Sequence, residues 1–319
     1  MSGERLLIAA ATVICALAAQ SGQDQVRTAV APRARPETRS SAPGRIRLDV
    51  RQVVIPVTVT GAFGEPLRGL PQEAFRVFED GVEQAVSYFA SEDAPVSVGV
   101  VFDASASMEH KLGRSREAVA RLFHTSMPGD EYFLVEFNNA PRVLCEFTSS
   151  MEEIQDRLSF IQPQGWTSLF DAVYLAVHKM KRARNPRKAL LILSDGADNN
   201  SRYTEPEIRE IVREGDVCIY SIGMAGWGIT GRSMRALRHL AEETGGRLFP
   251  VENLNELPGA VEKMSAALRN QYVLGYSSTN ADNDGKYRKV EVRLVPPDGS
   301  HSLRATWRLG YYAPAGLSR

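Results

Sequence analysis

Short apolar runs alternate with amphipathic segments in residues 95–267, and this alternation restricts the fold more than any other feature of the sequence. Residues 96–102 and 189–193 form apolar runs of strand length, without the polar alternation typical of a sheet that has one solvated face. Residues 115–125 and 169–180, by contrast, carry apolar side chains at helical spacing. Strands that are apolar on both faces need helices on both sides. The pattern therefore predicts an α/β domain with a doubly wound, mostly parallel sheet.

The segments on either side of this α/β block have the pattern of antiparallel strands. In residues 46–93, apolar and polar side chains alternate, and Gly, Pro and Asp mark the turns. Residues 270–315 return to the same pattern, with strands expected at 272–276, 288–295 and 302–309. We expect the two segments to join into one small antiparallel β module, with the α/β domain inserted between them.

The first 20 residues differ from the rest of the chain. Arg5 precedes an apolar run at residues 6–19 that ends in small side chains, a pattern typical of a secretory signal peptide. The run is shorter than the roughly 20 apolar residues of a membrane-spanning helix, although an uncleaved N-terminal anchor remains an alternative. Residues 21–45 are rich in Arg, Pro and Ser, so we expect a disordered linker. The chain is therefore expected to be exported to the periplasm, the cell envelope or the medium.

Charge and cysteine content exclude several classes of partner and scaffold. The 38 basic residues balance the 38 acidic ones, so no overall field favours nucleic acid or an anionic membrane. Contact with a membrane is expected only through an uncleaved N-terminal anchor. Beyond the signal segment, Cys145 and Cys218 lie in apolar runs, where two buried thiols are a simpler interpretation than a disulfide framework.

Polar side chains follow the first apolar run of the α/β block at alternate positions. Asp103, Ser105 and Ser107 form the pattern D-x-S-x-S directly after residues 96–102. Ligands bind at the carboxyl ends of strands in open α/β sheets. One carboxylate and two hydroxyls suit Mg²⁺, Mn²⁺ or Ca²⁺. By itself the pattern is weak, because Asp and Ser also favour turns and helix caps.

Two further loops strengthen the prediction of a metal site. Thr167 precedes the helical segment 169–180 and offers a third hydroxyl, and Asp195 follows the apolar run 189–193 with a second carboxylate. In a doubly wound sheet these loops can lie side by side with the D-x-S-x-S loop. Asp195 can then reach the ion directly or through water.

Taken together, these residues resemble the metal-ion-dependent adhesion site of von Willebrand factor type A domains. The resemblance covers residues 95–267 and agrees in residue type, spacing and order. It implies that the aspartate and two serines of D-x-S-x-S and the threonine ligate the ion, and that the later aspartate acts through water. The assigned residues are Asp103, Ser105, Ser107, Thr167 and Asp195. The flanks, residues 75–84 and 309–314, resemble bacterial exported proteins related to von Willebrand factor A that are abundant in acidobacteria, which extends the likeness to residues 46–315.

The ligand set predicts binding rather than catalysis. Asp103 is the expected direct carboxylate ligand, so the ion keeps a net positive charge and an open position for a Glu or Asp of a protein partner. We expect an exported adhesion or assembly module that uses Mg²⁺, or Mn²⁺ or Ca²⁺, and no small-molecule cofactor. No G-x-S-x-G or H-E-x-x-H pattern indicates an enzyme. The alternatives are a structural module whose metal only stabilises the fold, and a Mg²⁺-dependent phosphoryl-transfer enzyme that uses Asp103 as nucleophile but lacks a second acidic residue at position 105.

Several polar or aromatic residues near these loops have two interpretations. Asp198, with the asparagines that follow it, fits a polar turn better than a second cation site. Asp171 fits a helix-dipole partner better than a group behind the metal ligands. Trp166 suits recognition and packing equally. We expect His110 to face solvent, and Trp227 to lie in a surface loop.

Overall fold

The structure is a computed structural model of the whole chain, and it describes residues 52–62, 64–91, 93–195, 198–224, 231–295 and 303–315. The predicted signal peptide, the predicted linker and Trp227 lie outside the described residues. Within those ranges, no helix combines the length and the apolar character that crossing a bilayer requires.

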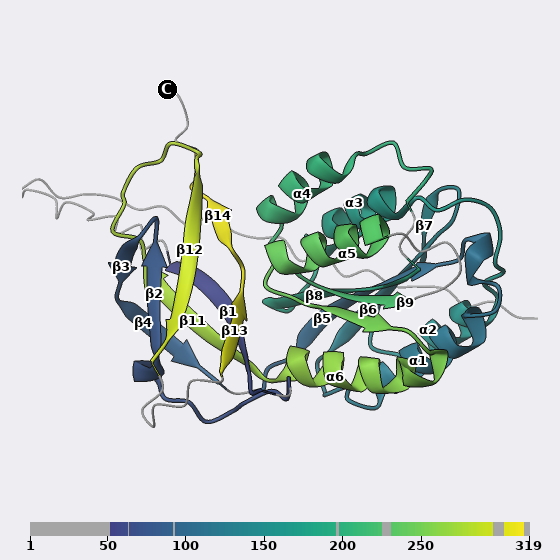
Figure 1. The fold of residues 1–319 in the computed structure, drawn as a ribbon, viewed down its shortest axis with the longest axis horizontal. Helices are drawn as coiled ribbons and strands as arrows, with labels where there is room; N and C mark the ends of the chain where they lie inside the picture. Colours follow the sequence, from purple (N-terminus) through teal and green to yellow (C-terminus); the bar gives the residue numbers. More distant parts are fainter. Residues whose placement is uncertain are drawn as a thin grey trace, which may run out of the picture. The chain divides into compact units, whose positions relative to one another are not determined.

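A six-stranded sheet forms the centre of the α/β domain (Figure 1). Its strand order is β10-β9-β8-β5-β6-β7, and all neighbouring pairs are parallel except β6 and β7. The tight turn at residues 138–140 explains the exception, because a connection this short can join only antiparallel strands. The doubly wound, mostly parallel sheet predicted from the sequence is confirmed. The strands are β5 (Val96–Asp103), β6 (Glu131–Phe137), β7 (Pro141–Thr148), β8 (Arg187–Ser194), β9 (Cys218–Met224) and β10 (Leu248–Val251).

Helices cover both faces of this sheet, as Figure 1 shows. Alternate residues of β5 belong to different cores: Val98 and Val100 pack with one set of helices, and Val101 packs with the other. Burial on both faces explains why β5 reads as one continuous apolar run. The first set is α1 (Leu112–Phe123), α2 (Met151–Ser159) and α6 (Leu257–Arg269). The second set is α3 (Leu169–Met180), α4 (Glu205–Glu214) and α5 (Gly231–Glu243).

The flanking segments form two four-stranded antiparallel sheets that share one core. Each sheet contains strands from both ends of the chain, which confirms that the α/β domain is inserted in a β module. The first sheet has the order β13-β1-β11-β4, built from β13 (Arg304–Trp307), β1 (Gln52–Thr60), β11 (Gln271–Ser277) and β4 (Val86–Ala90). The second has the order β14-β12-β2-β3, built from β14 (Gly310–Tyr312), β12 (Tyr287–Leu294), β2 (Phe75–Glu79) and β3 (Val82–Gln84).

After β13 the chain passes into the other sheet of the β module as β14. The strand expected at residues 302–309 contains β13, which ends at Trp307, whereas β14, which begins at Gly310 in the other sheet, was not expected. Between them Arg308 forms an isolated bridge with Thr244 of the α/β domain. The apolar pattern continues through this change of sheet because both sheets face the same core, so the sequence carries no sign of the break.

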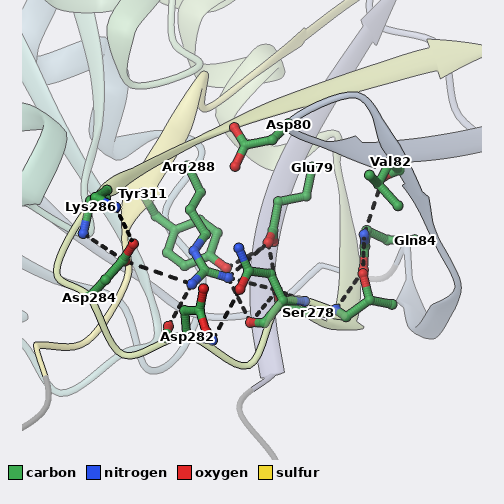
Figure 2. A network of polar contacts seen from close by, with 12 residues as sticks. Glu79, Asp80, Val82, Gln84, Ser278, Asp282, Asp284, Lys286, Arg288 and Tyr311 are labelled. Atoms are coloured by element: carbon green, nitrogen blue, oxygen red, sulfur yellow. Dashed lines mark hydrogen bonds and ion pairs between the residues drawn. The ribbon is translucent and has the colours of Figure 1, made fainter.

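A buried polar network occupies one end of the β module (Figure 2). Glu79 of β2 and Arg288 of β12 form an ion pair at 3.2 Å, with side chains that are 2% and 4% exposed. Glu79 also accepts hydrogen bonds from Tyr276, Ser278 and Tyr311. Burial raises the pKa of Glu79, but these hydrogen bonds and that from Arg288 outweigh burial and leave the pKa below its usual value. The network joins strands of both sheets.

Candidate metal site

The D-x-S-x-S loop leaves the sheet at the carboxyl end of β5. Asp103 is fully buried, and its Oδ1 accepts a hydrogen bond from the backbone N of Ser105 at 2.9 Å. This local bond bends the chain into a short 3₁₀ helix at Ala106–Met108. The hydroxyl oxygens of Ser105 and Ser107 lie 3.1 Å apart. Ser105 is buried and Ser107 is exposed, so the oxygen ligands extend from the sheet to the surface.

The loop before α3 lies directly against the D-x-S-x-S loop. Gln164 N donates to the Ala104 carbonyl at 2.9 Å, and Ala106 N donates to the Gly165 carbonyl at 3.1 Å. These bonds place Thr167, which is 3% exposed, beside the D-x-S-x-S loop.

Two side-chain amides hold this loop in place. Asn199 Oδ1 accepts from Thr167 N at 2.8 Å, and Asn139 Oδ1 accepts from Trp166 N at 2.8 Å. Gly165 has φ = 73°, and a Cβ on it would lie 2.4 Å from Asn139 Oδ1. Glycine is therefore required for the loop to approach so closely.

The third loop follows β8 and brings a second carboxylate to the site. Ser194 Oγ donates to Asp103 Oδ2 at 2.6 Å, which connects the ends of β8 and β5. Asp195 is 3% exposed, and its Oδ2 accepts from Lys111 Nζ at 2.8 Å. Its Oδ1 is buried and has no hydrogen-bond partner among the described residues. The structure therefore brings all five predicted residues to one edge of the sheet, on three adjoining loops.

The two carboxylates lie close enough to affect one another. Burial raises the pKa of Asp103 to about 6, while hydrogen bonds from Ser105 and Ser194 oppose this and the charge of Asp195 adds to it. A raised carboxyl pKa means that the negative charge is unfavourable in this environment. A cation placed there would stabilise the charged form.

The residues present fit a hard divalent cation. The buried Oδ1 of Asp195 lacks a partner in the described part of the chain, and the other candidate ligands are hydroxyls and one further carboxylate. Across the described ranges, no three His, Cys, Asp or Glu side chains group closely enough to hold a metal by themselves. Oxygen-only ligands of this kind suit Mg²⁺, Mn²⁺ or Ca²⁺ better than a soft transition metal.

The residues with two interpretations are placed as follows. Trp166 is 64% exposed beside Thr167, so it is available for recognition rather than packed in the core. His110 is exposed, as expected. Asp198 accepts from Phe170 N at 3.0 Å and is therefore a polar-turn residue that also satisfies the start of α3. Asp171 accepts from the backbone N of Arg202 at 2.9 Å, which ties the loop after β8 to α3.

An open groove of about 400 Å³ lies on the α3 side of the site. The rings of Tyr174 and Tyr203 stack there with centroids 4.4 Å apart, and Pro141 and Arg202 complete the walls. Asp171 lines the groove and also accepts a hydrogen bond from the loop after β8, so this one side chain connects the groove to a loop of the candidate metal site.

Sequence reasoning did not assign a role to two residues of the site. Ser194 is one of them, and its hydroxyl donates to Asp103. Lys111, which donates to Asp195, is the other. One signal for Lys111 is its place in the turn before the helix predicted at residues 115–125, because a basic residue there opposes the helix dipole and favours a negative partner. The sequence did not indicate which carboxylate that partner would be.

Comparisons with known proteins find relatives of this chain. A family model described as von Willebrand factor type A domain matches residues 98–197. Inter-alpha-trypsin inhibitor heavy chain H4 of Bos taurus is 27% identical over 177 residues, which cover 50% of this chain and 19% of the bovine protein. The corresponding protein of Mus musculus is 30% identical over 159 residues, or 17% of its length. The matches therefore cover less than one fifth of these relatives.

Several solved structures are similar to this chain at low identity. Proximal thread matrix protein 1 from the mussel byssus superimposes with a TM-score of 0.50 at 18% identity, over 60% of this chain and 51% of that one. A further structure of the mussel protein, with a TM-score of 0.48, has a zinc-occupied MIDAS motif. A von Willebrand factor type A protein from Catenulispora acidiphila has a TM-score of 0.49 at 14% identity and covers 84% of this chain and 75% of its own. The family match and the six-stranded sheet lead to one conclusion: the chain carries a von Willebrand factor type A domain.

Proposed function

We propose that the chain is a metal-dependent protein-binding module that engages a carboxylate of its partner. The observation that carries this proposal is the convergence of Asp103, Ser105, Ser107, Thr167 and Asp195 on three adjoining loops at one sheet edge, with Oδ1 of Asp195 buried and without a partner in the described residues.

The charges of the candidate ligands support a site in which a bound metal ion stays electrophilic. Asp103 and Asp195 supply two negative charges, and Lys111 already contacts one of them. The remaining candidate ligands are neutral hydroxyls. A bound divalent cation would supply an open coordination position and excess positive charge, and a Glu or Asp side chain is the natural ligand for both. The exposed Ser107 and Trp166 leave this edge accessible to a macromolecule.

Two alternatives differ from this proposal in a measurable way. A structural module would use the metal only to stabilise the fold. A phosphoryl-transfer enzyme would use Asp103 as nucleophile, but its Oδ1 accepts a hydrogen bond from Ser105 N and its Oδ2 accepts one from Ser194 Oγ. Because both oxygens are already hydrogen-bonded within a buried side chain, neither is free to attack a phosphorus atom. We therefore propose a binding protein rather than an enzyme.

We also propose that the protein is exported. The apolar run at residues 6–19 supports a signal peptide or an N-terminal anchor. The partner would then be a protein of the periplasm, the cell envelope or the medium. Fractionation of cells that express the full chain tests this point, and recovery in the cytosolic fraction with an intact N-terminus would contradict it.

The decisive experiment compares Asp103→Ala with Asp156→Ala. Asp156 lies on the exposed face of α2, so its substitution removes the same charge outside the site. Metal affinity is measured by calorimetry with Mg²⁺ and Mn²⁺. Capture is measured on immobilised Asp- and Glu-containing peptides and envelope proteins, with Mg²⁺ or with EDTA.

The binding proposal expects Asp103→Ala to lose metal affinity and capture while its melting temperature stays near that of Asp156→Ala. Capture should also be competed by a Glu-containing peptide and not by its Gln counterpart. A large fall in melting temperature with capture intact would favour the structural module. Turnover of a phosphoester by the wild type with Mg²⁺, lost in Asp103→Ala, would favour the enzyme.

A further inference from the structure

Lys111 places a positive charge against a carboxylate of the metal site. Its Nζ donates to Oδ2 of Asp195 at 2.8 Å, and the two side chains are 13% and 4% exposed. The backbone sets this position: Lys111 N donates to the Met108 carbonyl, and the Lys111 carbonyl accepts from Ser115 N at 2.9 Å and from Ser115 Oγ at 3.0 Å. The ammonium is therefore part of the site rather than a mobile surface group.

A lysine at this position is unfavourable for the helix that it precedes. Lys111 comes directly before α1, and its own side chain caps none of the helix amides. The amino-terminal end of a helix carries a partial positive charge, which repels a cation. The ion pair with Asp195 offsets this repulsion. The lysine thus costs α1 some stability and acts on the metal site instead.

Charge balance shows what the ammonium does there. Asp103 and Asp195 together carry two negative charges, which a divalent cation alone would neutralise. Asp103 is fully buried and Asp195 is 3% exposed, so water screens little of either charge. Including Lys111, the same site loaded with a divalent cation would carry one excess positive charge. The ammonium also competes with any metal for the charge of Asp195.

We propose that Lys111 is an internal counter-ion of the metal site. It neutralises Asp195 in the metal-free protein, lowers the affinity for divalent cations, and gives the loaded site the excess positive charge that attracts a carboxylate. Only the last of these effects rests on the proposed function. The first two require metal binding alone. Lys111 is in this sense a positioning residue that acts through Asp195.

The test uses three variants of the full chain. Lys111→Met keeps the aliphatic length and removes the charge, and Lys111→Arg keeps the charge. Lys263→Met removes the same charge from an exposed position on α6. Binding of Mn²⁺ alone is followed by the electron paramagnetic resonance signal of the free ion. Melting temperatures are measured in EDTA and with Mn²⁺, and circular dichroism verifies the fold.

Lys111→Met should bind Mn²⁺ about tenfold more tightly than the wild type, because a nearby unit charge no longer opposes the cation. In EDTA it should melt at a lower temperature, because Asp195 has lost its counter-ion. Mn²⁺ should raise its melting temperature by more than it raises that of the wild type. Lys111→Arg and Lys263→Met should resemble the wild type in all three measurements. Retention of a Glu-containing peptide on the Mn²⁺-loaded protein should fall about tenfold in Lys111→Met.

Mn²⁺ affinity in Lys111→Met no higher than in Lys263→Met would overturn the counter-ion role. A melting temperature of Lys111→Met in EDTA that equals that of the wild type would also overturn it. The Mn²⁺ titration needs no partner, so the two proposals fail separately. Tighter Mn²⁺ binding by Lys111→Met, with no peptide retention by any variant, would refute carboxylate recognition and leave the counter-ion role standing. Unchanged Mn²⁺ affinity of Lys111→Met, with the Glu-containing peptide still retained, would refute the counter-ion role and leave carboxylate recognition standing.

Discussion

The buried ion pair between Glu79 and Arg288 allows a quantitative prediction for Arg288→Met. Arg288 is 4% exposed, and its guanidinium donates to Glu79, to Ser278 Oγ at 3.2 Å, and to the carbonyls of Asn280 at 2.7 Å and Asp282 at 2.6 Å (Figure 2). Methionine removes all of these bonds and leaves Glu79 as a buried charge without its cation. Removing one partner of a buried pair costs about 3–5 kcal/mol. We expect the free energy of unfolding to fall by that amount at pH 7.

Urea unfolding followed by fluorescence measures this change in the β module. Trp307 is a suitable reporter because its Nε1 donates to the Val290 carbonyl at 3.0 Å, between the two sheets. Arg293→Met is the matched control. Arg293 lies on the same strand, but its side chain is 57% exposed in a pair with Glu291, so its loss should cost about 0–1 kcal/mol.

The pH dependence gives a second, independent measure. In the wild type the pKa of Glu79 is lowered, so its contribution to stability is present above the unfolded pKa of 4.5 and is lost as pH falls through the folded pKa. In Arg288→Met burial is no longer opposed by the guanidinium, so the native state favours protonated Glu79. The stability difference between variant and wild type should therefore narrow below pH 4.5. A loss below about 1 kcal/mol at pH 7, or a difference that stays constant with pH, would refute this reasoning.

Three further predictions concern the sheet and the metal loops. Gly99→Ala would place a Cβ 2.2 Å from Phe133 Cζ in the core, so it should lower the free energy of unfolding in urea by about 1–3 kcal/mol. Gly113→Ala, which has open space around it on α1, should raise that free energy by about 0.5–1 kcal/mol. Equal effects of the two substitutions would contradict the close packing at Gly99. In EDTA, wild-type stability should fall relative to Asp103→Asn as pH rises from 4 to 8, by up to about 3 kcal/mol. The reason is that folding raises the pKa of Asp103 from 3.8 to about 6, so its contribution to stability is fully present below the unfolded pKa and is lost as pH rises through the folded pKa. Parallel pH profiles of the two proteins would disprove this. Gly165→Ala, with φ = 73° and Asn139 in the way, should lower Mn²⁺ affinity by about tenfold by calorimetry. Gly69→Ala, with φ = 85° and no atom nearby, should lose comparable backbone stability and keep its Mn²⁺ affinity; equal affinity in the two variants would show that Gly165 does not position the site.

The sequence by itself determined the class of fold and indicated the residues of the candidate metal site. Burial on both faces makes β5 and β8 continuous apolar runs, and a parallel sheet with helices on both sides is the arrangement that satisfies them. The D-x-S-x-S pattern could be recognised because its spacing follows from local bonds, such as that from Ser105 N to Asp103. These features depend on neighbours in the chain or on the period of one element.

Tertiary structure alone decided which distant groups meet. Lys111 lies 84 residues from Asp195, and the sequence offers several other carboxylates as its partner. The bond from Ser194 to Asp103 exists because β8 lies beside β5, a neighbour relation that strand order sets. The break between β13 and β14 is likewise invisible in the apolar pattern, because both strands face one core. Local patterns identify strands, helices and loop ligands, whereas strand order determines which charges are buried together and therefore the electrostatics of the site.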